Sequence, residues 1–221
     1  RWQGEIERSQ EVQLLIKMED WDQASEDAQK LLQQDAKNLD GHLFHVFHLL
    51  AREGRTSMGL QRLEELCDIM ESVEPRNPGL LCRISSLIAR LSASNTDILG
   101  ITRDLMKKAC KLAPESSEYL IEHGFQLQLL GEYQEAINLY TQAGQFDDMN
   151  PKCLYASLQC QILMGRISEA QSQLRFLKEM TGEKENVAEL RLCEALIINA
   201  TSKDLTAMLS LVQESLSLIH I

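Results

Sequence analysis

The stretch Tyr119–Ala143, YLIEHGFQLQLLGEYQEAINLYTQA, predicts two helices joined by a tight turn. Gly124 lies where the first helix has to let a neighbouring helix approach closely, and Gly131 marks the turn. Residues at helical spacing form the inner stripe of the second helix: Tyr133, Ala136, Tyr140 and Ala143. The stretch is therefore expected to fold as a helical hairpin whose helices touch through small residues.

The same pattern returns 34 residues later, where Gly165 and Ala170 take the places of Gly131 and Ala136. Small residues at the equivalent position of successive hairpins are Ala24, Gly59, Thr102, Ala136, Ala170 and Ala207, at spacings of 35, 43, 34, 34 and 37. The long spacing contains the proline-rich connection EPRNPG at 74–79. A period of 34 residues built from two helices is the signature of the tetratricopeptide repeat (TPR).

The chain is therefore predicted to be an all-α, right-handed TPR superhelix, an α-solenoid of about six hairpins that forms one segment over residues 1–221. The expected hairpins are 5–35, 39–73, 78–113, 116–148, 151–181 and 186–219. In the first hairpin, helices are expected at 5–18 and 21–34, with Trp21 and Ala24 on the packed face and Asp20 as N-cap. Ala109 and Pro114 give the third hairpin the usual TPR ending, in which proline closes the loop.

Composition excludes several classes of function. The 221 residues are 44% hydrophobic and carry a net charge of −11, which disfavours nucleic acid and anionic membranes as direct partners. No apolar run approaches the roughly 20 residues needed to insert into and span a membrane. The six cysteines are scattered without a CxxC pair, which indicates buried thiols in a reducing compartment. The N-terminus does not resemble a signal peptide, and the missing initial Met suggests a fragment.

The sequence contains only weak signals for a metal-binding or catalytic site. His42, His45 and His48 point in directions spread over one helix, and the nearby acids Asp40 and Glu53 do not complete a convincing zinc site. The sequence contains no glycine-rich phosphate loop and no recognisable nucleophile with its base. We therefore expect no cofactor, no metal and no enzyme activity.

In a TPR array, the first helix of each hairpin lines a groove. The candidate partner-binding residues there are Phe44, His45, His48, Ile121, Phe125, Tyr155 and Gln159. Phe44, Phe125 and Tyr155 could anchor a helix or loop of a partner, with packing between repeats as the open alternative. Co-chaperones that hold a peptide carboxylate use Lys, Asn and Arg at these positions, which are apolar, aromatic or acidic here.

Four stretches, at 19–38, 70–81, 117–140 and 158–180, resemble the tetratricopeptide repeat protein 21 family, as does the unequal repeat spacing. The resemblance covers about residues 5–216 and matches an N-terminal part of a longer family solenoid, while SLSLIHI at 215–221 departs from the family. It implies a subunit of intraflagellar transport complex A, which acts in retrograde transport inside cilia and in moving membrane proteins into them.

The resemblance also implies a location in the cytoplasm, at the ciliary base and in the cilium. The implied partners are other subunits of the transport complex and cargo adaptors. The alternatives are a peptide-binding TPR co-chaperone or adaptor without a ciliary role, and a solenoid arm of an enzyme assembly whose catalytic domain lies elsewhere.

Overall fold

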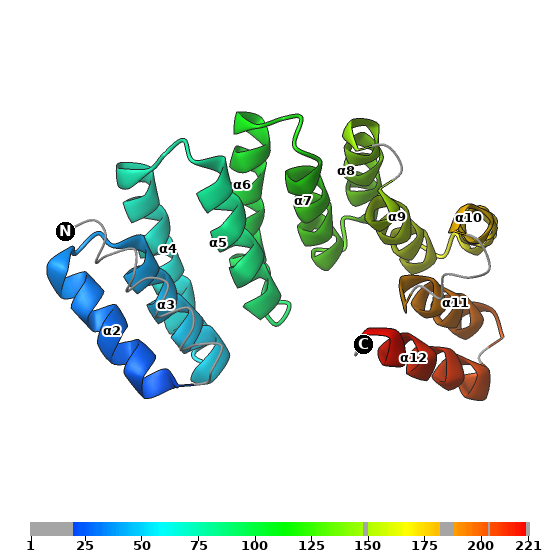
Figure 1. Cartoon of the computed structure of the whole chain (residues 1–221), viewed down its shortest axis with the longest axis horizontal. Helices are drawn as coiled ribbons and strands as arrows, with labels where there is room; N and C mark the ends of the chain where they lie inside the picture. The colour runs from blue at the N-terminus through cyan, green and yellow to red at the C-terminus, as the bar shows by residue number, and fades with distance from the viewer. Residues whose placement is uncertain (1–19, 148–149, 182–187, 203, 220–221) are drawn as a thin grey trace. The chain divides into compact units, whose positions relative to one another are not determined.

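Every regular element in the described part of the chain is a helix, as Figure 1 shows. The computed structural model describes residues 20–147, 150–181, 188–202 and 204–219. The helix expected at 5–18 lies outside these ranges. The all-α repeat fold predicted from the sequence is confirmed.

The chain divides into two compact units, residues 1–112 and 113–221. The described helices of the N-terminal unit are α2 (Trp21–Gln34), α3 (Leu39–Phe47), the π-helix η1 (His48–Arg52), α4 (Thr56–Val73), α5 (Pro78–Leu91) and α6 (Thr96–Leu112). Those of the C-terminal unit are α7 (Ser117–Leu129), α8 (Tyr133–Phe146), α9 (Pro151–Leu163), α10 (Ile167–Thr181), α11 (Ala188–Thr201) and α12 (Leu205–Ile219). One continuous segment over both units stays a prediction.

Polar side chains before the helices explain where several of them begin. Asn38, Asn77 and Ser116 each accept a hydrogen bond from a backbone N–H in the first turn of the following helix. Pro78 occupies the first turn of α5, where its missing N–H has no partner to lose. Because such caps are local, they can be predicted from the sequence, and the helix expected at 21–34 agrees with α2.

The turns inside two hairpins depend on glycine. Gly131 has a φ of +81° and Gly165 a φ of +75°, which is the left-handed region that other residues rarely adopt. Each glycine comes two residues after the last residue of the first helix and lets the chain reverse. The turn is therefore built the same way in both hairpins.

The hairpin expected at 39–73 begins with a helix that changes its geometry partway along. The α-helix ends at Phe47 and continues as the five-residue π-helix His48–Arg52. The wider turn carries Leu50 onto Gly59 of α4, so closely that a β-carbon at position 59 would overlap the Leu50 side chain. Gly59 thus provides the space into which the π-helix packs.

The core of the N-terminal unit lies between paired helices. Leu63, Leu66 and Met70 form the buried stripe of α4. Between α5 and α6, the Ser85 hydroxyl donates to the Thr102 carbonyl at 2.8 Å, so the buried polar group is satisfied. Each fully buried leucine contributes roughly 1.5–3 kcal/mol to folding, which makes these stripes the main source of stability.

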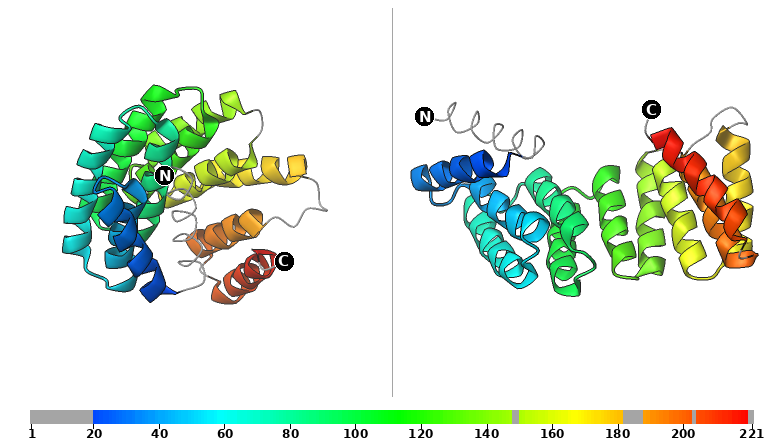
Figure 2. Two further views of the ribbon diagram at one scale, coloured as in Figure 1. Left: turned by 60° about the vertical axis from the view of Figure 1, so that its left-hand side comes forward. Right: turned by 90° about the horizontal axis from the view of Figure 1, so that it is seen from below.

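The core of the C-terminal unit also lies between packed helices. Ala136, Tyr140 and Ala143 of α8 are buried against α7. A second cluster joins α9, α10 and α11 through Tyr155, Leu158, Ile162, Ala170, Leu174, Leu177, Leu190, Cys193 and Ile197. The last two helices lie side by side (Figure 2), and the Ser215 hydroxyl of α12 donates to the Ala188 carbonyl of α11 at 2.9 Å.

The residues predicted for repeat packing fall into three groups. Six are completely or almost completely buried: Ala24, Ala109, Ala136, Tyr140, Ala143 and Ala170. Gly59 and Gly124 are buried as well, whereas Trp21 and Tyr133 are half-buried because each stands at the first position of its helix. Pro114 lies exposed in the turn after α6, as do Gly131 and Gly165 in their turns.

Candidate interaction surface

Two of the three aromatic residues expected to anchor a partner belong to the core. Phe44 is 2% exposed and packs with Ala24, Ala28 and Leu31. Tyr155 is 4% exposed and packs in the cluster that joins α9 to α10 and α11. Their burial corrects the groove assignment for both residues, because a partner cannot reach them without opening the core. The alternative left open by the sequence, packing between repeats, accounts for them.

The histidines of α3 and η1 interact with different groups. His48 Nδ1 lies 3.2 Å from Glu53 Oε1, and Arg55 Nε lies 3.1 Å from the other oxygen of the same carboxylate. A ring nitrogen of His42 bonds to the carbonyl oxygen of Ala36 at 2.9 Å. The three side chains therefore do not converge, and within the described residues no group of three or more His, Cys, Asp or Glu could hold a metal ion.

His45 is half-buried, and its surroundings favour the neutral ring. Burial lowers its pKa most, and the positive charge of Arg62, followed by His42 and His48, lowers it further. Aromatic residues also pack in this region of the N-terminal unit. Trp21 stacks on Phe47 with 5.7 Å between ring centroids. His45 and His48 thus form a partly exposed patch beside an aromatic cluster.

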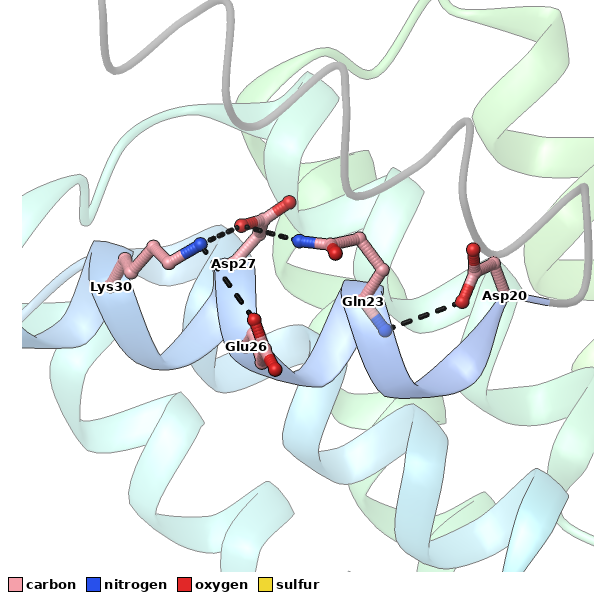
Figure 3. Close-up of polar contacts among 5 residues, drawn as sticks. All are labelled: Asp20, Gln23, Glu26, Asp27 and Lys30. Carbon is pink, nitrogen blue, oxygen red and sulfur yellow. Dashed lines mark hydrogen bonds and ion pairs between the residues drawn. The ribbon is translucent and has the colours of Figure 1, made fainter.

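A buried carboxylate on α2 was missed by sequence reasoning. Asp27 accepts hydrogen bonds from Lys30 Nζ at 2.7 Å and from Gln23 Nε2 at 3.2 Å, and Figure 3 shows these side chains along one side of the helix. Lys30 also lies 4.0 Å from Glu26, and Asp20 caps the first turn. The Asp-x-x-Lys spacing is the sequence signal for this pair. The pair stabilises α2.

In the C-terminal unit, polar side chains connect three helices. The Tyr140 hydroxyl of α8 donates to Gln128 Oε1 at 3.1 Å, and Gln128 Nε2 donates to Gln159 Oε1 of α9 at 3.4 Å. Gln159, a predicted groove residue, therefore holds α9 against α7. Ile121 and Phe125 of α7, the other groove candidates of this unit, are half-buried.

Exposed leucines lie on the first helices of the three C-terminal hairpins, and the sequence prediction did not include them. Leu129 of α7 is 40% exposed, Leu163 of α9 is 53% exposed and Leu192 of α11 is 36% exposed. The signal was available, because Leu129 and Leu163 are 34 residues apart and occupy the same repeat position.

We name the surface around these leucines the inner face. It consists of Ile121, Phe125 and Leu129 on α7, Gln159 and Leu163 on α9, and Leu192 and Leu196 on α11. On each helix these residues are four positions apart, so they share one side. The helix α9 contacts both α7 and α11.

The charged residues of α7, α9 and α11 are mainly acidic. Glu118 and Glu189 are exposed on α7 and α11, and Glu122 is half-buried on α7. Arg191 lies 2.9 Å from Glu194 and 3.4 Å from Glu214, so its charge is neutralised, while Lys152 is exposed on α9. These residues differ from the Lys, Asn and Arg set that holds a peptide carboxylate.

The cysteines are free thiols, of which Cys82, Cys153, Cys160 and Cys193 are buried and Cys67 and Cys110 are partly buried. Burial raises the pKa of Cys67, Cys110 and Cys160 to about 11 and that of Cys193 to about 12. A thiol with a raised pKa is a poor nucleophile at neutral pH. These side chains therefore pack as small apolar groups.

Among the described helices, none is long and apolar enough to cross a membrane.

Solved structures of similar fold include a tetratricopeptide repeat protein and a pilus biogenesis factor. A tetratricopeptide repeat protein from Parabacteroides merdae superposes with a TM-score of 0.61 at 12% identity, covering 95% of this chain and 83% of that one. PilW, a type IV pilus biogenesis factor, gives a TM-score of 0.62 at 14% identity, covering 95% and 90%. At these identities the likeness establishes the TPR fold alone.

Sequence relatives lie in one eukaryotic family. Human tetratricopeptide repeat protein 21B is 30% identical over 93% of this chain and 16% of its own length. The Xenopus laevis 21B protein is 31% identical over 94% and 16%, and human 21A is 27% identical over 94% and 16%. The chain thus spans about one sixth of these relatives. Residues 61–220 match the model of the second ARM domain of tetratricopeptide repeat protein 21. This chain therefore belongs to the tetratricopeptide repeat protein 21 family.

Proposed function

We propose that this chain is a non-catalytic scaffold segment of intraflagellar transport complex A, which acts in retrograde ciliary transport and cilium assembly. The observation that carries the proposal is family membership, which rests on the match over residues 61–220. The chain spans about 16% of its relatives, so the complex is a proposal about the whole protein. Its place of action is the cytoplasm at the ciliary base and the cilium.

The mechanism that we propose is binding by a stiff helical surface. Hairpins stack through buried small residues such as Ala136 and Ala170, so the exposed side chains between them keep fixed positions. Other subunits of the transport complex and cargo adaptors dock on these side chains. The proposed contacts are His45 and His48 in the N-terminal unit, and Ile121, Phe125 and Gln159 in the C-terminal unit.

Two features support a role without catalysis. Burial raises the pKa of the Cys193 thiol to about 12, and the buried carboxylate Asp27 is bonded to Lys30 and Gln23 within one helix. An enzyme site would instead bring a nucleophile or base to an accessible position.

Affinity purification of the intact protein from ciliated cells, followed by mass spectrometry, tests the proposal. Subunits of the transport complex are expected to co-purify. Purification that yields chaperones or unrelated enzymes without any ciliary transport subunit would contradict it.

A variant experiment tests the contact residues. Phe125→Ala is expected to reduce recovery of transport subunits, because its half-buried ring contributes both to packing and to the accessible surface. The matched control is Phe176→Ala on α10, which removes an exposed phenylalanine outside the inner face. Thermal unfolding of both variants separates lost binding from lost stability.

A further inference from the structure

We infer that Gln159 of α9 binds a main-chain carbonyl oxygen of an extended segment of a protein partner, and that Leu163 binds an apolar side chain of the same segment. The inference rests on the proposed scaffold function and adds the form of the partner and the group that recognises it. The hydrogen bonds that fix the Gln159 amide and the residues beside it on α9 support it.

Hydrogen bonds across three helices fix the direction in which the Gln159 amide points. The Tyr140 hydroxyl of α8 donates to Gln128 Oε1 at 3.1 Å, which leaves Gln128 Nε2 to donate to Gln159 Oε1 at 3.4 Å. Tyr140 is 1% exposed, and among the described residues its hydroxyl hydrogen has no other acceptor. If the Gln128 amide were reversed, this buried donor would face an NH2 group and lose its acceptor. The oxygen of Gln159 is therefore the atom that faces Gln128.

The Nε2 group of Gln159 is the open end of this series of hydrogen bonds. It has no hydrogen-bond partner within the described part of the chain, and it is not buried. A side-chain NH2 group carries two donors and no acceptor, so a bound partner has to supply an oxygen. Because the neighbouring amide already holds Gln159 in position, little side-chain freedom is lost when that partner binds.

The residues beside Gln159 leave room for a main chain and provide an apolar contact. Lys152, Ala156, Gln159 and Leu163 are spaced by four, three and four residues, so they share one side of α9. The side chain of Ala156 ends at its β-carbon, which lets a partner backbone approach the amide from that direction. Leu163, one turn in the other direction, is 53% exposed. A single helix therefore presents the donor and the apolar contact on one side.

The free donor and the spacing favour an extended partner. Carbonyl groups inside a helix already accept hydrogen bonds from their own chain, whereas those of an extended segment need outside partners. Gln159 and Leu163 are separated by about 6 Å along the axis of α9. Residues two apart in an extended chain are about 6.6 Å apart and point to the same side. A segment that lies along α9 can thus contact both residues at once.

The charged residues on α7 and at the ends of α9 are of both signs. Lys152 and Arg166 are exposed near the two ends of α9, and Glu118 is exposed on α7. Glu122 of α7 is half-buried and accepts a hydrogen bond from Gln126 Nε2 at 3.4 Å. Recognition is therefore expected to depend on the amide rather than on net charge, and the affinity should change little with salt.

Peptides selected on the full 221-residue chain test the inference. A phage library of random peptides of about 12 residues is panned against the chain, and enriched sequences are synthesised with a fluorescent label. Their affinities are measured by fluorescence anisotropy. Gln159→Ala and Leu163→Ser are each expected to weaken binding at least about fivefold.

Matched controls lie on α10. Gln171→Ala removes an exposed glutamine, and Phe176→Ser removes an exposed apolar side chain. Both are expected to leave binding unchanged. Circular dichroism and thermal unfolding verify that each variant folds.

Ester substitution identifies the main-chain contact. Each peptide bond of an enriched peptide is replaced in turn by an ester, whose carbonyl oxygen is a weaker hydrogen-bond acceptor. At one position the ester is expected to weaken binding to the wild-type chain at least about threefold but to leave binding to Gln159→Ala unchanged. Tyr140→Phe keeps the buried ring but lets the Gln128 amide turn, so it is expected to make the effect of this ester smaller.

The inference is overturned if no peptide is enriched, or if the enriched peptides bind Gln159→Ala as tightly as the wild-type chain. It is also overturned if no ester shows coupling to Gln159, or if nuclear Overhauser effects show that the peptides bind as helices. Co-purification from ciliated cells separates the inference from the proposed function. A wild-type chain that recovers transport subunits, with peptide binding that does not depend on Gln159, contradicts only the inference. A chain whose peptide binding depends on Gln159 but which recovers no transport subunit contradicts only the proposed function.

Discussion

The ring of Tyr140 lies directly on Gly124, so that a β-carbon at position 124 would stand 2.6 Å from Tyr140 Cε1 and 2.9 Å from Cζ. The hydroxyl of the same tyrosine donates to Gln128, one turn further along α7. Burial raises the pKa of this phenol well above its usual range, which keeps it protonated as a donor. The pair therefore fixes how closely α7 and α8 approach.

Replacing Gly124 by alanine is expected to lower the free energy of unfolding by about 1–3 kcal/mol, because the methyl group forces the tyrosine ring away. Urea unfolding followed by circular dichroism measures the change. Gly144→Ala on α8 is the control, since a β-carbon there meets nothing within 4 Å. It should stabilise the chain by about 0.5–1 kcal/mol through helix propensity. Equal effects of the two substitutions would contradict the close contact.

Ala136→Leu tests the small-residue position of the same hairpin. Ala136 is completely buried, so a larger side chain is expected to overpack the contact and cost roughly 1–3 kcal/mol. Gln134→Leu, at an exposed position two residues earlier, adds a similar side chain without crowding. A melting temperature that Ala136→Leu leaves unchanged would show that the contact tolerates volume.

The positions of Gly124 and Ala136 could be predicted because they depend on spacing along one hairpin. The period of 34 residues places each small residue opposite its neighbour, and polar caps such as Asn77 mark the helix starts. The π-helix His48–Arg52 could not be predicted in this way. Its apolar residues fit a regular helix as well, and the widened turn is decided by the fit of Leu50 against Gly59.

The candidate surface was harder to predict than the fold. Phe44 and Tyr155 stand at the border between the packed and open sides of their helices, where burial depends on the neighbouring hairpin. Leu129 and Leu163 were missed because a leucine in a helical pattern is ordinarily expected to be buried in the core. A pattern along one chain does not give the neighbour that covers each position, whereas the packed structure does.

High pH is expected to destabilise the chain. The folded pKa of Cys160 is about 11 and that of Cys193 about 12, above the ordinary value of a thiol, because burial disfavours the thiolate. Their contribution to stability is therefore fully present below the unfolded pKa and is lost as pH rises through about 9 toward the folded values. Urea unfolding at pH 7.5 and pH 10, two conditions around that onset, measures the loss.

Cys193→Ala is expected to reduce this loss, since the variant has one buried thiol fewer. Ile197→Ala, which truncates another buried side chain of α11, lowers stability at both pH values but keeps the wild-type pH dependence. An equal pH dependence in all three proteins would contradict the role of the thiol.

The turn between α5 and α6 contains two residues with left-handed backbone, Ala93 with φ of 47° and Ser94 with φ of 66°. The left-handed conformation costs a residue with a β-carbon roughly 1 kcal/mol, and glycine avoids this strain. Ser94→Gly is therefore expected to raise stability by about 0.5–1 kcal/mol. Ser172→Gly in the exposed middle of α10 should do the opposite. If the melting temperature falls in both the Ser94→Gly and the Ser172→Gly variant, the backbone at Ser94 is not strained.

A chain of ion pairs links three C-terminal helices. Glu194 of α11 pairs with Lys178 of α10 and with Arg191, which also reaches Glu214 of α12. Glu194 is largely shielded from solvent, so Glu194→Gln should cost about 1–2 kcal/mol by weakening both of its charged contacts. Half-exposed Lys178 makes part of this cost sensitive to salt.

The control for this network is Glu65→Gln, which breaks the exposed pair with Arg62 on α4. An exposed pair contributes little, so this variant should change stability by less than about 0.5 kcal/mol. Urea unfolding at low and high salt compares the two variants. If Glu194→Gln costs no more than Glu65→Gln at low salt, the carboxylate does not hold α10 against α11, and the buried cluster around Leu177 and Leu190 must do so alone.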